Sequence, residues 1–152
     1  MRLEGTCECG AVRFAVSSRT PYPYRTCSCR RCRKTAGSIG AAVNVVAEAE
    51  TLEVTGSPTR FEHPVEPVVL SFCGTCGSPM FLEIPAFPQW VYPFASAVDT
   101  PLPAPPEFVH VRTDERPSWT PAIGSPDDLR FEANTDESMV EWHERMGLVT
   151  PD

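Results

Sequence analysis

The seven cysteines of this 152-residue chain gather in three short groups and are the residues best suited to chemistry. A C-x-C pair forms a disulfide poorly because the bond demands a particular geometry, whereas thiolates wrap readily around a metal ion. Three thiolates on a tetrahedral zinc leave one position open, as in zinc enzymes; in the alternative, a fourth ligand closes the site and the metal only holds the fold. The groups are Cys7 and Cys9; Cys27, Cys29 and Cys32; and Cys73 and Cys76.

Spacing alone does not decide which groups share a metal. The simplest division joins the two outer pairs into a closed four-thiolate site and leaves the middle three cysteines as an open one. Residues 73–77 (CGTCG) are typical of a zinc knuckle, in which glycines let backbone N–H groups point at the sulfurs. A redox pair is the alternative for Cys73 and Cys76, and burial as small hydrophobic residues is the alternative for Cys7 and Cys9. A metal shared by the two outer pairs would close the long loop between Cys9 and Cys73, so we expect it to stabilise the fold strongly. Four thiolates bind iron as well as zinc, so the type of metal stays open.

Basic side chains surround the middle group, because five of the 13 Lys and Arg residues fall at positions 25–34. Positive charge lowers thiol pKa values and attracts an anionic substrate toward an open coordination position. In the alternative, these side chains only keep an exposed loop solvated. The net charge of −7 and the lack of interleaved aromatic residues argue against nucleic acid as a partner. The candidate substrate-binding residues are Arg30, Arg31, Arg33, Lys34 and His110, the last being alternatively a proton shuttle or a packed histidine.

Composition favours one small domain built mostly of strands and loops. Proline accounts for 17 residues, which disfavours long helices. No stretch approaches the ~18 apolar residues of a membrane span, and the chain does not start with a signal-peptide pattern. Seven cysteines without an export signal indicate a reducing compartment, so we expect a cytoplasmic protein with no membrane partner. We expect residues 1–134 to form a zinc-binding β domain, with a helix and tail at 135–152 packed on the same domain.

Apolar periodicity predicts the regular elements. Residues 51–54 and 59–63 predict a hairpin, and the cysteine-rich stretch 27–34 predicts a loop. The only predicted helix covers about 136–146, with His143 in a structural role on its apolar face. The tryptophans are expected mainly in the core. Strands are predicted at 11–16, 41–45, 68–72, 78–84, 89–94 and 107–111, the last of these being the final strand.

Three motifs span much of the first 120 residues: 5–14 (GTCECGAVRF), 27–38 (CSCRRCRKTAGS) and 72–80 (FCGTCGSPM), with a weaker one at 110–119 (HVRTDERPSW). In this order they resemble the glutathione-dependent formaldehyde-activating enzyme family, which includes centromere protein V. The resemblance implies a mostly β zinc-binding fold, the β-tent, made of several short antiparallel strands with one C-terminal helix. It also implies two zinc ions, a structural zinc on Cys7, Cys9, Cys73 and Cys76 and a catalytic-type zinc on Cys27, Cys29 and Cys32.

The same resemblance implies a carbon–sulfur lyase that joins glutathione to formaldehyde and gives S-(hydroxymethyl)glutathione. A thiol at an open zinc position ionises near neutral pH, because the metal stabilises its anion, and it then adds to an electrophilic carbon. Arginines near the middle group could hold the carboxylates of a glutathione-like thiol. The chain has Ser28 where the family often has histidine, and serine cannot act as a base there. The alternative function is a non-catalytic, zinc-stapled binding module for a protein or nucleic-acid partner.

Overall fold

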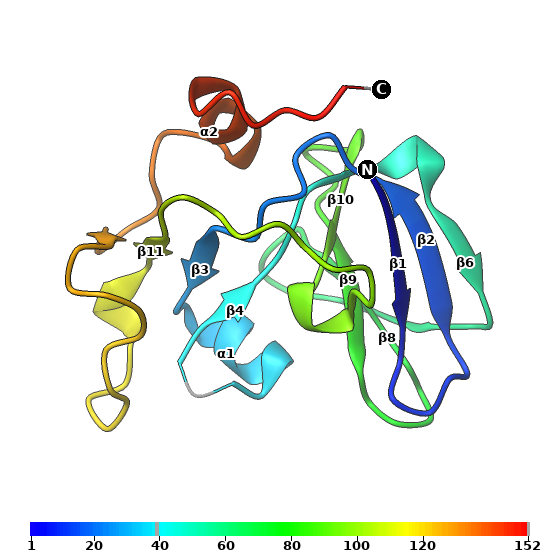
Figure 1. Cartoon of the computed structure of the whole chain (residues 1–152). Helices are drawn as coiled ribbons and strands as arrows, with labels where there is room; N and C mark the ends of the chain where they lie inside the picture. The colour runs from blue at the N-terminus through cyan, green and yellow to red at the C-terminus, as the bar shows by residue number, and fades with distance from the viewer. Residues whose placement is uncertain (39, 152) are drawn as a thin grey trace.

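The computed structural model describes residues 1–38 and 40–151. In this part of the chain, three small sheets and two short α-helices carry most of the regular structure, which is mainly β (Figure 1). The expected fold class is confirmed: a mostly β chain of short antiparallel strands with one helix near the C-terminus. Parallel pairing occurs as well, in the sheet that leads into the middle cysteine group.

The N-terminal sheet is a hairpin with one added strand. Side chains alternate between the two faces along its first two strands, and the apolar residues Leu3, Phe14 and Val16 lie on the buried face. The sheet has the order β1–β2–β6, and its strands are β1 (Arg2–Thr6), β2 (Arg13–Ser17) and β6 (Glu53–Thr55).

The central sheet is antiparallel throughout, with the order β5–β10–β9–β8–β7. Phe81 on its middle strand meets Phe14 of the N-terminal sheet edge to face, with ring centroids 5.9 Å apart. These two sheets therefore share the main hydrophobic core. The strands are β5 (Ala47–Glu48), β7 (Thr59–Glu62), β8 (Val69–Phe72), β9 (Pro79–Glu83) and β10 (Trp90–Pro93).

The predicted hairpin between residues 51–54 and 59–63 is wrong. Strand β6 pairs with β2 and strand β7 pairs with β8, so the two segments belong to different sheets. Gly56 turns the chain between them with φ 86°, and a Cβ at this position would lie 2.1 Å from the carbonyl oxygen of Ala11. The connection is thus packed against the β1–β2 hairpin. Strand β6 pairs with the free edge of β2 and forms hydrogen bonds with backbone groups that would otherwise be unpaired.

The third sheet has the order β12–β11–β3–β4, in which β11 is parallel to both of its neighbours. Its three parallel strands end at Cys27, Val111 and Arg130, so the segments that follow them emerge at one edge of the sheet. The strand predicted at 107–111 is β11, but it is not the final one, because β12 follows it. The strands are β3 (Arg25–Cys27), β4 (Ala42–Val43), β11 (Val109–Val111) and β12 (Leu129–Arg130).

The stretch predicted as a loop at 27–34 contains a helix, α1 (Arg30–Ala36). The Cys29 side chain caps this helix by accepting a hydrogen bond from the backbone N–H of Cys32 at 3.4 Å. A thiol here does what a serine or aspartate side chain usually does at a helix start. Gly37 ends the helix in the left-handed conformation, with φ 58°.

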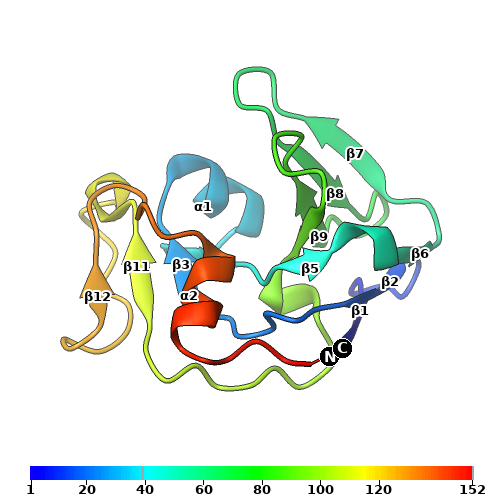
Figure 2. The same ribbon diagram turned by 90° about the horizontal axis from the view of Figure 1, so that it is seen from above.

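Helix α2 (Met139–Arg145) lies within the predicted helix at 136–146 and covers the side of the third sheet that bears Val109 and Val111 (Figure 2). Trp142 is fully buried and stacks on Tyr24 with ring centroids 3.7 Å apart. The division of the chain into a domain at 1–134 and a packed helix and tail at 135–152 stays a prediction, which this stacking supports.

His143 occupies a structural position, as expected, because it is fully buried on α2. The backbone N–H of Tyr22 donates to its Nε2 at 3.2 Å, and its Nδ1 lies 2.6 Å from the carbonyl oxygen of Met139. The ring is therefore neutral with its proton on Nδ1, and burial lowers its pKa. Trp119 departs from the expected core position, since it is 73% exposed.

The described residues also form three short 3₁₀ helices: η1 (Ala49–Thr51), η2 (Ala95–Ala97) and η3 (Thr113–Glu115). Among the helices of residues 1–38 and 40–151, none has the length and apolar character needed to cross a membrane.

Candidate metal centres

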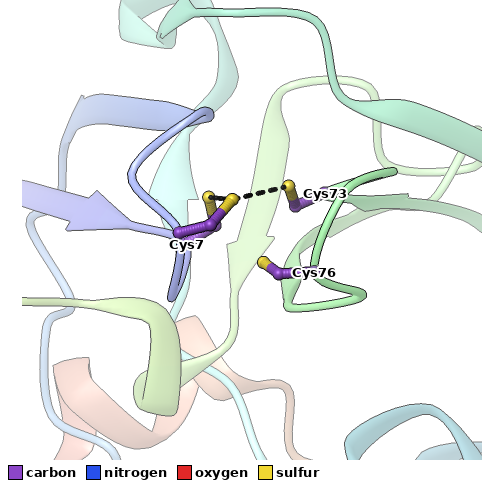
Figure 3. Close-up of side chains that lie close together, drawn as sticks. Cys7, Cys73 and Cys76 are labelled. Atoms are coloured by element: carbon purple, nitrogen blue, oxygen red, sulfur yellow. Dashed lines mark hydrogen bonds between the residues drawn. The ribbon is translucent and has the colours of Figure 1, made fainter.

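The outer cysteines meet where two turns approach each other. Cys7, on the β1–β2 turn, faces Cys73 and Cys76 on the β8–β9 turn (Figure 3). Cys9, on the same turn as Cys7, completes the group. The Sγ atoms of Cys7 and Cys9 are 3.6 Å apart, and those of Cys9 and Cys73 are 3.7 Å apart. A tetrahedron with zinc–sulfur bonds of about 2.3 Å has edges of about 3.8 Å, whereas a disulfide needs about 2.05 Å. The four thiols therefore have the spacing of a zinc site.

Each of the two turns is shaped by one glycine. Gly10 and Gly77 adopt φ angles of 75° and 77°, which favour glycine, and their N–H groups donate to the carbonyl oxygens of Cys7 and Cys73 at 2.9 Å and 2.8 Å. The backbone N–H of Val12 also donates to the Cys7 sulfur at 3.2 Å. The Val12 donor stabilises thiolate charge on Cys7, whereas the N–H groups of Gly10 and Gly77 donate to carbonyl oxygens and hold the two turns in shape.

The electrostatics of the outer group favour metal-binding thiolates. Burial opposes ionisation of Cys7, but hydrogen bonds from the Val12 N–H and from the thiols of Cys73 and Cys9 lower its pKa. The Ser78 side chain and backbone lower the pKa of Cys76 to about 6. The backbone N–H of Ala11 lowers the pKa of Cys9, yet the neighbouring thiols outweigh it and raise this pKa to about 12. Without a cation, four adjacent sulfurs cannot all be charged, and a metal relieves that repulsion.

The middle cysteines meet where β3 passes into α1. Cys27 ends the strand, Cys29 caps the helix, and Cys32 lies one turn further on the buried side. Their sulfur atoms all lie within 4.8 Å of one another. Within residues 1–38 and 40–151, no fourth Cys, His, Asp or Glu joins this group. The helix that sequence reasoning missed is thus the element that brings the three thiols together.

One thiolate is already favoured in the middle group. Hydrogen bonds from the thiols of Cys27 and Cys32 lower the pKa of Cys29 to about 2, and the charge of Arg31 adds to this effect. Contacts with the thiols of Cys27 and Cys29 raise the pKa of Cys32, and the contact with Cys29 raises that of Cys27. Three soft sulfur donors lie close together here, and one of them ionises readily. This arrangement is suited to bind a zinc ion.

The basic residues of α1 surround the middle group, but their side chains differ in what they contact. Arg31 forms an ion pair with Glu66, and Arg33 donates from Nε to the carbonyl oxygen of Ser28 at 2.9 Å. Arg30 and Lys34 are exposed. The structure therefore keeps positive charge near the thiols while committing the two less exposed arginines, 31 and 33, to partners within the protein.

His110 is buried in a chain of polar contacts. Its Nδ1 lies 2.7 Å from the Thr26 hydroxyl, and its Nε2 lies 2.8 Å from a carboxylate oxygen of Asp128. Both ring nitrogens of His110 are thus engaged by neighbouring side chains, and its role as a substrate contact or a proton shuttle stays a prediction. Asp128 was not predicted, since only tertiary folding brings it from 18 positions away to the ring.

Arg112 is a second residue that sequence reasoning missed. It has the sole positive φ among the described non-glycine residues, 56°, and it forms an ion pair with Glu115. Glu115 in turn accepts a hydrogen bond from the backbone N–H of Arg30 at 2.7 Å. Burial would lower the pKa of Arg112, but the acidic side chains at 114 and 115 and the Cys29 thiolate raise it. A strained, cationic residue close to the middle group is a candidate for function.

The fold and the two thiol groups define a class of protein: a small, mostly β chain with two candidate metal centres made of cysteine. The sequence model of the family described as glutathione-dependent formaldehyde-activating enzyme matches residues 2–115, a range that contains all seven cysteines. The chain belongs to this family, as its motifs indicated.

Two individual proteins show how far the similarity extends. A Halomonas elongata protein, which carries the provisional name of a glutathione-dependent formaldehyde-activating enzyme, is 44% identical over 154 residues, covering 97% of this chain and 98% of that protein. A solved structure of a Rhodobacter sphaeroides protein superposes with a TM-score of 0.54 at 19% identity, covering 84% of this chain and 98% of that chain. The second similarity concerns the fold alone.

Proposed function

We propose that the protein is a zinc-dependent carbon–sulfur lyase that joins glutathione, or a similar small anionic thiol, to formaldehyde or another small aldehyde. The observation that carries this proposal is the middle group, in which three thiols converge without a fourth protein donor among the described residues. We also propose a structural zinc at the outer group and a cytoplasmic location. Membership of the family supports the choice of thiol and aldehyde.

The reaction balances without an oxidant or a reductant. The thiol sulfur attacks the carbonyl carbon, so that one carbon–sulfur bond forms and the carbonyl double bond becomes a single bond. The thiol proton is finally carried by the former carbonyl oxygen, which gives a hydroxymethyl thioether. Zinc held by Cys27, Cys29 and Cys32 would supply a Lewis acid that keeps a substrate thiol ionised near neutral pH.

The protein's own residues prepare the site for an anionic thiol. Arg31, held by Glu66, and Arg112, held by Glu115, both place positive charge near Cys29. Cys29 is fixed in turn by its hydrogen bond at the start of α1. A preorganised positive field favours the thiolate form of the substrate and its approach to the site.

The test is exchange NMR of the zinc-loaded protein with glutathione and ¹³C-formaldehyde. We expect formation of S-(hydroxymethyl)glutathione to exceed its uncatalysed rate. The Cys29→Ser variant should lose this acceleration and bind one zinc fewer while keeping its circular dichroism spectrum. Thr35→Ser, on the same helix but outside the thiol group, should behave like the wild type.

An acceleration that survives Cys29→Ser would exclude the middle group as the reacting site. Two bound zinc ions with no acceleration in the wild type would instead support the alternative function, a zinc-stapled module that binds a partner.

A further inference from the structure

A pocket of about 240 Å³ lies at the edge of the third sheet where its parallel strands end. Ser28 directly follows β3, Thr113 follows β11, and Arg130 ends β12, and all three line the pocket with His110 and Arg116. Ligands of sheets with parallel strands are commonly found beyond the carboxyl ends of the strands. The pocket therefore has the placement of a binding site.

Two arginines give the pocket a positive charge that the described part of the chain does not neutralise through an ion pair. Arg130 donates from Nη1 to the carbonyl oxygen of Asp128 at 2.9 Å and from Nη2 to that of Ile123 at 2.8 Å. Arg116 donates to the carbonyl oxygen of Thr120. Neutral carbonyls orient these guanidinium groups, and neither group forms an ion pair within the described residues, although the Asp128 carboxylate lies close enough for its charge to interact with that of Arg130. Fixed guanidinium groups are suited to bind a carboxylate.

The inner wall of the pocket is rigid. Asp128 accepts a hydrogen bond from His110, which together with the Ser125 N–H lowers the pKa of this carboxyl group, although burial opposes the shift. With Asp128 ionised, Nε2 of His110 carries the proton and Nδ1 accepts from the Thr26 hydroxyl. Gly124 encloses the pair so closely that a Cβ would lie 2.1 Å from the carboxylate oxygen. Hydrogen bonds from His110 and the Ser125 N–H thus hold the Asp128 carboxylate in place, and the wall is preorganised.

The pocket is next to the middle cysteine group. Ser28 is the residue between Cys27 and Cys29, and its backbone N–H donates to the carbonyl oxygen of Val111, two positions before Thr113, at 3.1 Å. At about 240 Å³ the pocket is smaller than the usual range of 300–1,000 Å³ for a whole ligand. It suits one end of a substrate whose other end reaches the cysteines.

We propose that this pocket, through Arg116 and Arg130, binds a carboxylate of the anionic thiol whose sulfur reacts at Cys27, Cys29 and Cys32. The proposal rests on the proposed function and specifies which residues hold the substrate. It assigns that task to Arg116, in the loop after β11, and to Arg130, the last residue of β12, and not to the basic side chains of α1, which were the candidates from the sequence.

The test is calorimetric binding of S-methylglutathione, which retains the carboxylates of glutathione but has no free thiol. Losing a hydrogen-bonded charge pair should weaken binding about ten-fold or more in Arg116→Gln and in Arg130→Gln. The lysine variants should recover part of the affinity, since they keep the charge without the fork geometry. Arg60→Gln, an exposed arginine on β7, is the matched control and should bind like the wild type.

Arg130 is exposed, so Arg130→Gln decides the matter even if Arg116→Gln fails to fold. Wild-type affinity in Arg130→Gln, equal weakening in Arg60→Gln, or no binding of S-methylglutathione by the wild type would each overturn the proposal. Cys29→Ser separates it from the proposed function, because this variant should lose the reaction with formaldehyde and still bind S-methylglutathione. Arginine-dependent binding without any catalysis would leave the pocket assignment standing and refute the lyase.

Discussion

Replacing Cys76 by serine should destabilise the protein far more than a substitution at an exposed position usually does. Cys76 is exposed, and changes at such positions normally alter the free energy of unfolding by about 0.5 kcal/mol or less. A metal in the outer group, however, would tie Cys9 to Cys73, which are 64 positions apart. The chain-entropy treatment of a cross-link spanning that distance gives about 4 kcal/mol. We therefore expect Cys76→Ser to lose much of this amount.

For a chain of this length, each 1 kcal/mol shifts the thermal midpoint by roughly 2–4 °C, so full loss of the cross-link lowers it by roughly 8–16 °C. Cys29→Ser is the matched comparison. Cys27 and Cys32 are only five positions apart, which makes the entropic contribution of a metal there smaller by about 2 kcal/mol. The assay is thermal unfolding followed by circular dichroism, with zinc counted in the same samples. Equal midpoints for Cys76→Ser and the wild type, with one zinc lost, would refute the reasoning.

Three further predictions follow from packing and protonation. Gly124→Ala should cost about 2 kcal/mol or more in denaturant unfolding, because φ is +80° and the new Cβ meets a carboxylate, whereas Gly147→Ala, with open space around it, should cost about 1 kcal/mol. Trp142→Ala should cost about 3–5 kcal/mol, and Trp119→Ala, at an exposed position, should cost about 0.5 kcal/mol or less by the same assay. His143 is neutral and its pKa is lowered by burial, so the unfolded state takes up the proton first, and the unfolding free energy should decrease as pH falls through about 6.5. A pH-independent free energy between about pH 8 and 5.5, or an unchanged slope in His143→Gln, would contradict that expectation.

Much of the two thiol groups could be predicted from the sequence, because thiol spacing constrains a metal site locally. Cys73 and Cys76 lie in one turn, and the glycine after the pair allows the required backbone. The helix beside Cys29 was missed because sequence patterns look for serine, threonine, asparagine or aspartate at a helix start, and a cysteine takes that place here.

The pocket and the polar chain behind it could not be predicted in the same way. Asp128 reaches His110 only because two-residue strand β12 aligns beside β11, and so short a strand has no alternating pattern to recognise. Arg116 and Arg130 could not be told from ordinary surface residues, because only the tertiary fold brings them to one pocket. The hairpin predicted around Gly56 is wrong because turn residues show where the chain reverses but not which strand each segment pairs with.

Counting the zinc ions per chain in the wild type and in Cys29→Ser, together with calorimetric titration of glutathione, shows whether the middle cysteine group activates a thiol. We expect two zinc ions in the wild type and one in the variant. We also expect glutathione binding to weaken when the second zinc is lost, since the thiol then has no metal to bind. A single zinc in the wild type, or two zinc ions with glutathione affinity that Cys29→Ser leaves unchanged, would contradict the assignment of Cys27, Cys29 and Cys32 as the thiol-activating site.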